Sequence, residues 1–331
     1  MDKILLGHGS GGKLMHQLIR DHFSPAFGIE GSGDSAIVNV PSKRLAYTTD
    51  SYVVTPLFFP GGNIGDLAVC GTVNDLSVAG AVPLFLTAGF IIEEGFPLSD
   101  LKKIITSMAA AARLAGVRIV AGDTKVVNKG KADGVFINTS GLGVLHEGVE
   151  ISSSRIRAGD KVLISGEIGN HGVAIIAERN GLTFDPPVQT DSRPLNDLTR
   201  AMLDAAKDIH FMRDPTRGGL ATTLKEAALE SGLCIKVQED TLPIPPQVKG
   251  ACGLLGLDPL YAANEGILIA ILERADADAV LTVMKKHPYG QSAVIIGDVT
   301  AAPSGMVLLE TAIGGSRILD MLAGEQLPRI C

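Results

Sequence analysis

The stretch Cys70-Gly71-Thr72-Val73-Asn74-Asp75-Leu76-Ser77-Val78-Ala79 places two adjacent polar residues inside an apolar run. A Pro60-Gly61-Gly62 break precedes this run, and we predict a helix over 64–79. A carboxylate in such apolar company is costly to bury unless it is paired or bound to a cation. Asp75 is therefore the first candidate for a functional residue.

On both sides of this helix, apolar segments bounded by glycine, proline or charge predict alternating strands and helices. The first half reads as strands over 37–40, 45–49, 83–92, 117–121 and 136–145, with a helix over 101–115 that Ser99 would cap. The pattern shifts near 152–157 and then resumes. We predict an α/β fold with domains at 1–154 and 155–311 and a flexible, glycine-bearing tail at 312–331.

Composition narrows the class of protein. The 331 residues are 46% hydrophobic, include 39 glycines and no tryptophan, and carry a net charge of −7. Without a basic block we expect no nucleic-acid binding, and no apolar stretch is long enough for a membrane span. The first residues lack the apolar run of a signal peptide, and the four cysteines have no CxxC spacing, so we expect a cytoplasmic protein.

Carboxylates recur at the predicted ends of elements. Asp34, Asp50 and Asp123 lie at strand edges or turns, as Asp75 lies within the helix, and Lys125 follows closely. Singly, each fits an ordinary turn aspartate. As a set they favour a site for one or two Mg²⁺ ions with phosphate, because magnesium prefers hard oxygen ligands.

Two glycine-bearing segments suggest anion binding. The segment from Gly7 to Lys13 nearly matches a phosphate loop, but Leu14 stands where a hydroxyl is needed. Its glycines would either admit a phosphate or form a mobile loop. In 213–219, Asp214-Pro215 predicts a helix start, and Arg217 with two glycines suits an anion. We read the isolated His171 as structural.

The sequence closes on Pro328-Arg329-Ile330-Cys331. A thiolate is a good nucleophile and acyl acceptor, and the preceding glycines make a tether. A terminal cysteine alone is more often incidental, so a function for Cys331 requires a site elsewhere that the tail can enter. The other three cysteines have apolar or small neighbours and read as core thiols.

Taken together, several stretches resemble the hydrogenase maturation factor HypE family. That family shares the fold of aminoimidazole ribonucleotide synthetase (the PurM-like fold), as does selenophosphate synthetase. The aspartate and glycine motifs identify the ATP-binding fold, whereas the closing PRIC, with GDTKVV and the PLFFPGGNIG run, is specific to HypE. The matching stretches are HGSGG (8–12), TTDSYVVTPLFFPGGNIG (48–65), CGTVNDLSVAGAVP (70–83), GDTKVV (122–127), INTSGLG (137–143), RDPTRGG (213–219), ANEG (263–266) and PRIC (328–331).

The resemblance implies an ATP-dependent dehydration. A HypF-like carbamoyltransferase would load a carbamoyl group onto Cys331, ATP would phosphorylate the carbamoyl oxygen, and loss of phosphate would leave a thiocyanate. The cyanide would pass through a HypC–HypD complex to the iron of a NiFe hydrogenase. The family also implies a homodimer that pairs N-terminal sheets, with ATP near the interface.

The resemblance also implies roles for individual residues, with ATP and Mg²⁺ as cofactors. The catalytic candidates are Cys331, Lys125 for transition-state charge, Glu265 as the base and Asp75 as the second candidate base. The metal candidates are Asp34, Asp50, Asp75 and Asp214. The nucleotide candidates are Gly9, Ser10, Gly11, Gly12, Asp50, Asp123, Thr124, Asn138, Thr139, Gly141 and Arg217.

Two alternatives remain at this point. Selenophosphate synthetase would share the aspartates, but it typically carries a reactive cysteine or selenocysteine in the N-terminal glycine loop, and here the first cysteine is Cys70. A non-catalytic carrier would present Cys331 to partners, but it would not need the aspartates or Lys125. ATP turnover separates the carrier from the enzyme.

Overall fold

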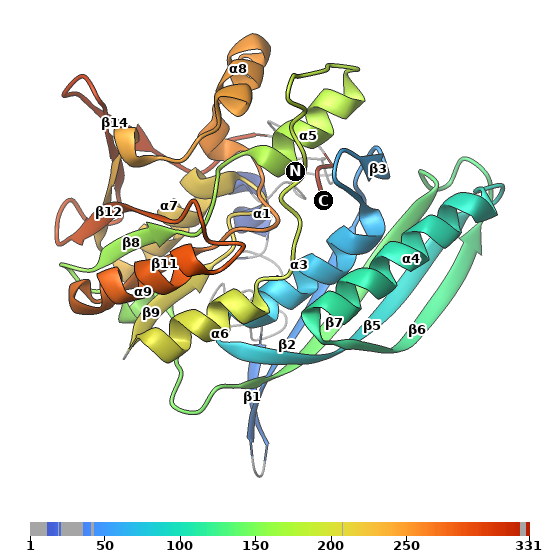
Figure 1. Ribbon diagram of the computed structural model, residues 1–331, viewed down its shortest axis with the longest axis horizontal. Coiled ribbons are helices and arrows are strands. Elements are labelled where there is room, and N and C mark those ends of the chain that lie inside the picture. Colours follow the sequence, from blue (N-terminus) through green and yellow to red (C-terminus); the bar gives the residue numbers. More distant parts are fainter. Residues whose placement is uncertain (1–11, 19, 21–35, 41–42, 207, 325–328) are drawn as a thin grey trace.

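The computed structural model describes residues 12–18, 20, 36–40, 43–206, 208–324 and 329–331. Two mixed sheets with helices against them lie side by side, which confirms the predicted α/β class (Figure 1). None of the helices in these ranges combines the length and the apolar character that a membrane span requires.

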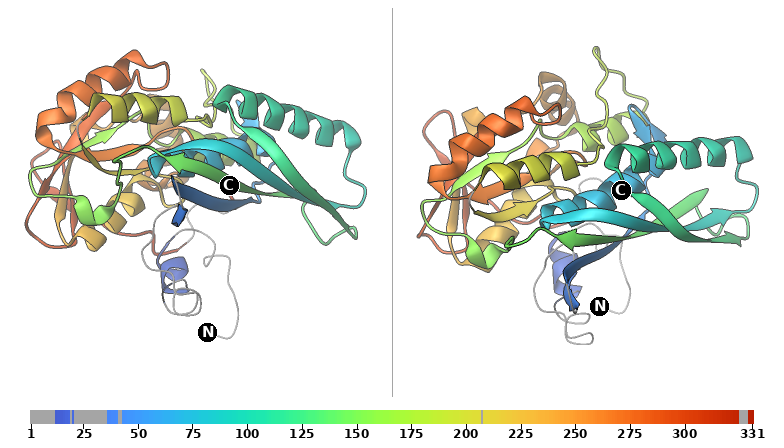
Figure 2. Two further views of the ribbon diagram at one scale, coloured as in Figure 1. Left: turned by 90° about the horizontal axis from the view of Figure 1, so that it is seen from below. Right: turned by 60° about the horizontal axis from the view of Figure 1, so that its bottom comes forward.

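The first sheet has the strand order β1-β2-β7-β5-β6 and is antiparallel except for the pair β5–β6. Its long strands alternate buried and exposed side chains, since one face is covered and the other is open. Helices α3 and α4 cover one face, and no helix in the described ranges covers the other (Figure 2). The bounds are β1 Ala36–Val40, β2 Lys43–Tyr52, β5 Ala81–Glu93, β6 Arg118–Val127, β7 Val135–Leu145, α3 Ile64–Val78 and α4 Leu98–Ala115, with the β3–β4 hairpin at Phe58–Phe59 and Gly62–Asn63.

The second sheet has seven strands in the order β14-β13-β10-β12-β8-β11-β9, all antiparallel except β10–β13. Helix α7 packs its apolar face on one side of the sheet, and α6 and α9 pack on the other. The strands are β8 Lys161–Ile164, β9 Ile209–Arg213, β10 Cys234–Gln238, β11 Ile269–Leu272, β12 Val294–Thr300, β13 Val307–Glu310 and β14 Ser316–Leu319. The helices are α1 Lys13–Leu18, α5 Asn170–Arg179, α6 Asn196–Ala205, α7 Gly219–Ser231, α8 Pro246–Leu255 and α9 Arg274–Lys286, with short 3₁₀ turns at Ser153–Arg155, Glu239–Thr241 and Pro259–Tyr261.

Helix α3 joins the two halves. Every residue in it is buried except Asp66 and Asp75, as expected for a helix that is surrounded by protein. Its side chains pack on β2, β5 and β7, and Val78 at its end enters the apolar cluster of α6 and α9. The predicted helix over 64–79 is therefore confirmed, and it carries Asp75 to the junction of the two halves.

Three details of the prediction for the first half of the chain are wrong. The strand that we expected to end before Gly122 continues as β6 through Val127, because Asp123 and Lys125 pair in register with Gly89 and Ile91 of β5. Likewise, β2 continues past Asp50 to Tyr52. Helix α4 begins at Leu98 with Pro97 before it, and Ser99 does not cap it.

Candidate active site

Asp75 faces the β2 strand at the junction. It is partly buried, and the Thr48 hydroxyl donates a hydrogen bond to its Oδ2 at 2.9 Å. Its neighbour Asn74 is fully buried and ties the two halves together. The Asn74 amide donates to the Glu265 carbonyl at 3.0 Å, and its Oδ1 accepts from the Leu195 amide at 2.8 Å.

Glu265 lies beside this junction, just before β11. Its side chain is 2% exposed, and Oε1 has no hydrogen-bond partner. Burial raises the pKa of this carboxyl well above its usual value, and the nearby charges of Asp214 and Asp191 raise it further. Asp191 also fixes the backbone here, because its carboxylate accepts from the amides of Glu265 and Gly266, both at 3.1 Å. The result is a buried carboxyl group whose neutral, protonated form is favoured.

The thiol of Cys331 interacts electrostatically with Glu265 and Asp214. Burial raises the pKa of Cys331 to about 12, Arg217 opposes this shift, and Glu265, Asp50 and Asp214 add to it. The Cys331 thiolate is in turn the largest cause of a raised pKa at Arg217. The tail therefore enters a site in the folded protein, which is the condition that the sequence left open for a functional cysteine. Cys70, Cys234 and Cys252 are free and buried, which confirms them as core thiols.

Arg217 and Asp214 come from the turn before α7. We predicted that Asp214-Pro215 starts this helix, and that is wrong: α7 begins at Gly219. Gly218 and Gly219 have φ values of +77° and +59°, and a Cβ on Gly219 would lie 2.6 Å from the Ala262 carbonyl oxygen. These two glycines form a tight turn whose positive φ values favour glycine. Asp214, which precedes the turn, is buried.

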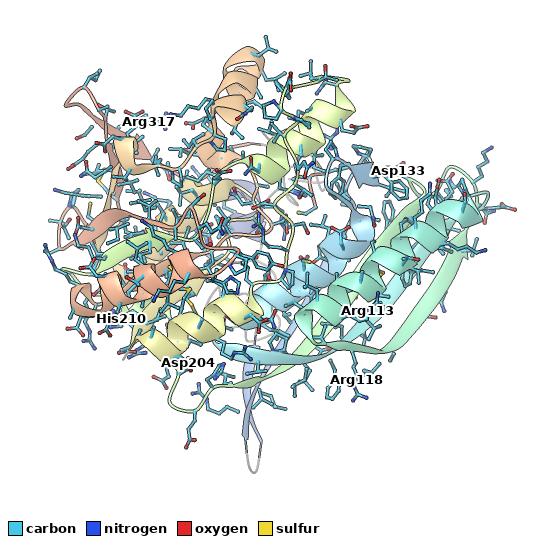
Figure 3. The ribbon with its side chains drawn as sticks, viewed as in Figure 1. Arg113, Arg118, Asp133, Asp204, His210 and Arg317 are labelled. Carbon is cyan, nitrogen blue, oxygen red and sulfur yellow. The ribbon has the colours of Figure 1, made fainter. Side chains whose placement is uncertain are left out.

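Main-chain contacts hold the end of the tail against the end of β2. The Val53 amide donates to the Cys331 carbonyl oxygen at 3.2 Å, and Ile330 is buried in the core of the first half. Arg329 has a φ of +51°, and its guanidinium pairs with Asp133 and lies 5.8 Å from the Phe136 ring centre (Asp133 is labelled in Figure 3). The partly buried Cys331 is thereby held at the junction of the two halves.

His171 also contacts the tail, although we read it as structural. It is fully buried, its Nε2 lies 3.0 Å from the Ile330 carbonyl oxygen, and its Nδ1 lies 2.7 Å from the Thr190 hydroxyl. Sequence reasoning missed His171, Asn74 and Asp191 as site residues. The signal was present only as the polar pair at 74–75 and the glycine loop at 166–172, since a contact with the tail is not visible in local sequence.

Two of the predicted nucleotide residues, Asp123 on β6 and Asn138 on β7, lie on the open face of the first sheet together with Lys125. Asp123 and Lys125 form an exposed ion pair at 2.8 Å. Asn138 is exposed and donates to the Asp50 carbonyl at 2.8 Å. The described chain therefore places Lys125 on the side of the sheet opposite α3, apart from the group around Cys331.

Thr139 and Gly141 have packing roles. The Thr139 hydroxyl donates to the Ala68 carbonyl at 2.9 Å, and a Cβ on Gly141 would lie 2.8 Å from Thr72 Cγ2. Both allow α3 to lie close to β7, and their assignment to a nucleotide remains a prediction. Four further candidates lie outside the described residues: Gly9, Ser10, Gly11 and Asp34. Of the other two, Thr124 lies on strand β6 and Gly12 is buried.

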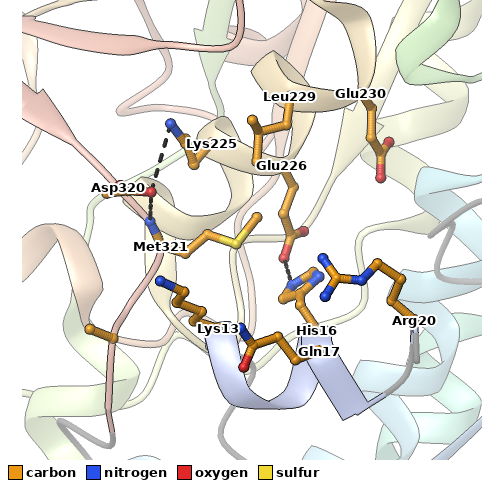
Figure 4. A pocket seen from close by; sticks show the side chains of 11 residues that line it. Lys13, His16, Gln17, Arg20, Lys225, Glu226, Leu229, Glu230, Asp320 and Met321 are labelled. Carbon is orange, nitrogen blue, oxygen red and sulfur yellow. Dashed lines mark hydrogen bonds and ion pairs between the residues drawn. The ribbon is translucent and has the colours of Figure 1, made fainter. Parts of the chain in front are cut away.

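The predicted tail is attached at Leu322 to α1 and α7, beside a cavity of about 600 Å³ (Figure 4). The Lys13 amide donates to the Leu322 carbonyl at 3.0 Å, and the Leu322 amide donates to the Thr222 hydroxyl at 3.3 Å. A Cβ on Gly12 would lie 2.3 Å from the Leu322 carbonyl oxygen. His16 pairs with Glu226, which raises the pKa of that histidine. The tail is thus anchored at Leu322 and again at its last three residues.

The comparisons with known proteins agree with this architecture. The N-terminal domain of AIR synthase related proteins matches residues 32–145, and the C-terminal domain of the same group matches 157–310. Fold and site therefore define an AIR synthase related protein. The chain is 54% identical to the carbamoyl dehydratase HypE of Bradyrhizobium diazoefficiens and 52% identical to that of Cupriavidus necator, over 98% and 99% of this chain and 95% of each relative. The chain belongs to the HypE family of carbamoyl dehydratases, which are enzymes, and the resemblance is confirmed.

Solved structures give the same result. A crystal structure of a HypE–HypF complex is similar with a TM-score of 0.87 and 51% identity, over 92% of this chain and 99% of that chain. A structure of HypE in complex with ATP has a TM-score of 0.85 and 48% identity, over 99% and 100%. Thiamine monophosphate kinase from Aquifex aeolicus, at 17% identity and a TM-score of 0.66, shares the fold alone.

Proposed function

We propose that this chain converts a carbamoyl group on Cys331 into a thiocyanate with consumption of ATP. The single observation that carries the proposal is the position of the thiol, which lies among Glu265, Asp50, Asp214 and Arg217 at the junction of the two halves. An incidental cysteine would not be expected among ionisable groups in a buried site. The names of the relatives and the ATP complex of one of them support the same reaction.

The chemistry requires one phosphoryl transfer and the removal of two protons. The carbamoyl oxygen attacks the γ-phosphorus of ATP and releases ADP, and loss of one N–H proton gives S–C(=NH)–O–phosphate. Loss of the second N–H proton then expels phosphate and leaves S–C≡N. Phosphorylation is needed because the amide oxygen is a poor leaving group.

Glu265 suits the role of the base. Burial favours the protonated form of this carboxyl, and the raised pKa makes Glu265 a stronger base whenever it is in the carboxylate form. Its partnerless Oε1 leaves a lone pair for the amide N–H. Asn74 and Asp191 hold its backbone in place, and Arg217 provides positive charge for a phosphoryl group.

The carboxylates suit magnesium only in combination with a nucleotide. Among the described residues no three carboxylate, cysteine or histidine groups form a metal cluster. Asp50, Asp75 and Asp214 offer hard oxygen ligands, and each of them interacts electrostatically with Arg217 or with Cys331. Mg²⁺ commonly completes its coordination shell with phosphate oxygens and water. We assign Mg²⁺ to these three aspartates with the ATP phosphates, where it would neutralise phosphate charge.

The open face of the first sheet supports a homodimer. Tyr47 and Ile91 are 48% and 44% exposed on this face, which also carries Asp123, Lys125 and Asn138. A second copy that pairs with this face would cover the apolar side chains and bring its own polar row near ATP. In that arrangement Lys125 acts on the transferred phosphoryl group from the interface.

The proposal implies partners before and after the reaction. A HypF-like carbamoyltransferase supplies the carbamoyl group, as the complex solved for a relative suggests, and a HypC–HypD complex accepts the cyanide. Four free cysteines suit a reducing compartment, and we place the reaction in the cytoplasm. The domain limits at 154 and 311 remain part of the proposal.

Intact mass spectrometry tests the function directly. We would incubate the protein with its carbamoyltransferase, carbamoyl phosphate and ATP, beside a Cys331→Ala variant. The expected result is a carbamoyl adduct that loses the mass of one water when Mg-ATP is added, with no adduct on the variant. ATP hydrolysis without an adduct on Cys331 would refute the proposal and point to another activity of the same fold.

A further inference from the structure

The main-chain oxygens of residues 329, 330 and 331 are all engaged as hydrogen-bond acceptors. Two of the four donors are backbone amides just after β2, and the other two are side chains of α5. The contacts are Thr55 N to Arg329 O at 3.3 Å, Arg179 Nη2 to Arg329 O at 3.0 Å, His171 Nε2 to Ile330 O at 3.0 Å and Val53 N to Cys331 O at 3.2 Å.

Arg179, at the last residue of α5, bridges the two sides of this contact. Its Nε donates to the Thr55 carbonyl at 3.0 Å, while Nη2 donates to the Arg329 carbonyl. The planar guanidinium suits this task, because its several N–H groups diverge in a fixed fork. One side chain therefore fixes the tail relative to β2.

His171, in the first turn of α5, has its tautomer set by its partners. A carbonyl oxygen can only accept, so Nε2 carries the proton toward Ile330. Nδ1 is then the acceptor for the Thr190 hydroxyl, whose oxygen accepts from the Ser192 amide at 3.1 Å. Burial lowers the pKa of His171, which keeps the imidazole neutral as this chain of hydrogen bonds requires.

We propose that His171 and Arg179 are positioning residues that hold the docked tail through its main-chain carbonyls and leave the sulfur of Cys331 free. These contacts do not change when the group on the sulfur changes from thiol to carbamoyl to thiocyanate. Release of the tail therefore requires these hydrogen bonds to break, rather than a chemical change at the sulfur. The identity of the sulfur-bound groups rests on the proposed function, but the contacts do not.

The rate at which Cys331 reacts with dithionitrobenzoate measures how often the tail leaves its site. The thiolate attacks the reagent disulfide, forms a mixed disulfide and releases one thionitrobenzoate, and the three buried cysteines contribute only a background that Cys331→Ala reveals. Loss of one hydrogen bond costs about 1 kcal/mol, so we expect a roughly fivefold to tenfold faster reaction for His171→Ala and for Arg179→Ala.

Two variants control for a general loss of structure. His171→Gln places an amide donor near the position of Nε2 and should react at close to the wild-type rate. Glu178→Ala changes the exposed neighbour of Arg179 on the same helix and should leave the rate unchanged. Thermal unfolding of each variant is measured in parallel.

Three results would overturn the proposal. In the first, Cys331 of the wild-type protein reacts with dithionitrobenzoate as fast as it does in the unfolded chain. In the second, both alanine variants react at the wild-type rate. In the third, His171→Ala lowers the unfolding temperature but does not make Cys331 react faster. A second measurement tests independence from the sulfur: after alkylation of Cys331 with iodoacetamide, carboxypeptidase should still remove the last residues slowly in wild type and faster in the Arg179→Ala protein. Rapid removal of the last residues at the same rate from the wild-type and Arg179→Ala proteins would also contradict the proposal. No step uses ATP or a carbamoyl donor, so these outcomes are independent of the proposed reaction.

Discussion

At the scale of the residue, Glu265 derives its chemistry from its surroundings. The family resemblance singled out this residue, but the sequence around it, Ala263-Asn264-Glu265-Gly266, shows neither burial nor charge. Its raised pKa comes from desolvation and from Asp214, which lies far away in the sequence. Local sequence can therefore propose the residue, whereas only the fold supplies the reason that it can act as a base.

Glu265→Gln should separate the base from the rest of the site. Glutamine has nearly the same volume and cannot accept the amide proton, so we expect dehydration of the carbamoyl adduct to slow by about 100-fold or more. Loading of Cys331 by the carbamoyltransferase should be unaffected. Single-turnover mass spectrometry of the adduct measures both steps, and dehydration at the wild-type rate would exclude Glu265 as the base.

Asp66 should give the protein a measurable pH dependence of stability. Burial raises its pKa from 3.8 to about 6, although the Asn63 amide donates to it. The folded state thus binds this proton more tightly than the unfolded state, so its stabilising contribution is complete below pH 4 and is lost as pH rises through 6. Asp66→Asn keeps an acceptor oxygen for Asn63 and removes the charge.

We therefore expect Asp66→Asn to raise the free energy of unfolding by about 1–3 kcal/mol at pH 7.5 and to have little effect below pH 4. Urea unfolding at a series of pH values checks this. Asp100→Asn, at a carboxylate paired with Lys103 on the surface, is the control. A gain that is equal at every pH would contradict the assignment.

At the scale of the element, the apolar pattern predicted most helices and strands to within a few residues. It failed where tertiary pairing decides the outcome. Residues 122–127 contain glycine and charge and read as a turn, yet they form the exposed edge strand β6 because β5 offers a parallel partner. Strand β14, in what we predicted as tail, likewise exists through its pairing with β13.

Gly141→Ala tests whether that glycine serves the packing of α3 or the nucleotide. The new methyl group would crowd Thr72, Leu76 and Leu86, so we expect a loss of about 1–3 kcal/mol in the free energy of unfolding. Gly89→Ala is the control on the same sheet, because its Cβ has no neighbour closer than 3.8 Å. Urea unfolding and ATP titration measure the two effects, and weaker ATP binding without destabilisation would favour a nucleotide role.

At the scale of the whole molecule, the sequence could indicate two α/β halves and a tail but not how they meet. The site uses the end of β2, the C-terminal part of α3, the turn before α7 and the last residue, which are separated by most of the chain. Nothing in local periodicity brings these together. The family resemblance implied that the tail enters a site in the folded protein. The contacts of His171 and Arg179 with the tail arise only from the three-dimensional structure.

The proposed dimer predicts that a charge on the open sheet face separates the subunits. Ile91→Arg places a cation among the apolar side chains that a second copy would cover, so we expect a change from dimer to monomer in sedimentation velocity. Leu254→Arg on α8, at a leucine that is 71% exposed, is the matched control and should stay dimeric. If wild type sediments as a monomer, this face is not a dimer interface.

The attachment of Leu322 to α1 and α7 limits how far Cys331 can travel. Nine residues lead from Leu322 to Cys331, and an extended chain covers at most about 3.6 Å per residue. With Leu322 fixed, the sulfur is confined to a sphere with a radius of roughly 30 Å. A protein that loads the sulfur and a protein that unloads it must both bring their reactive atoms into this sphere.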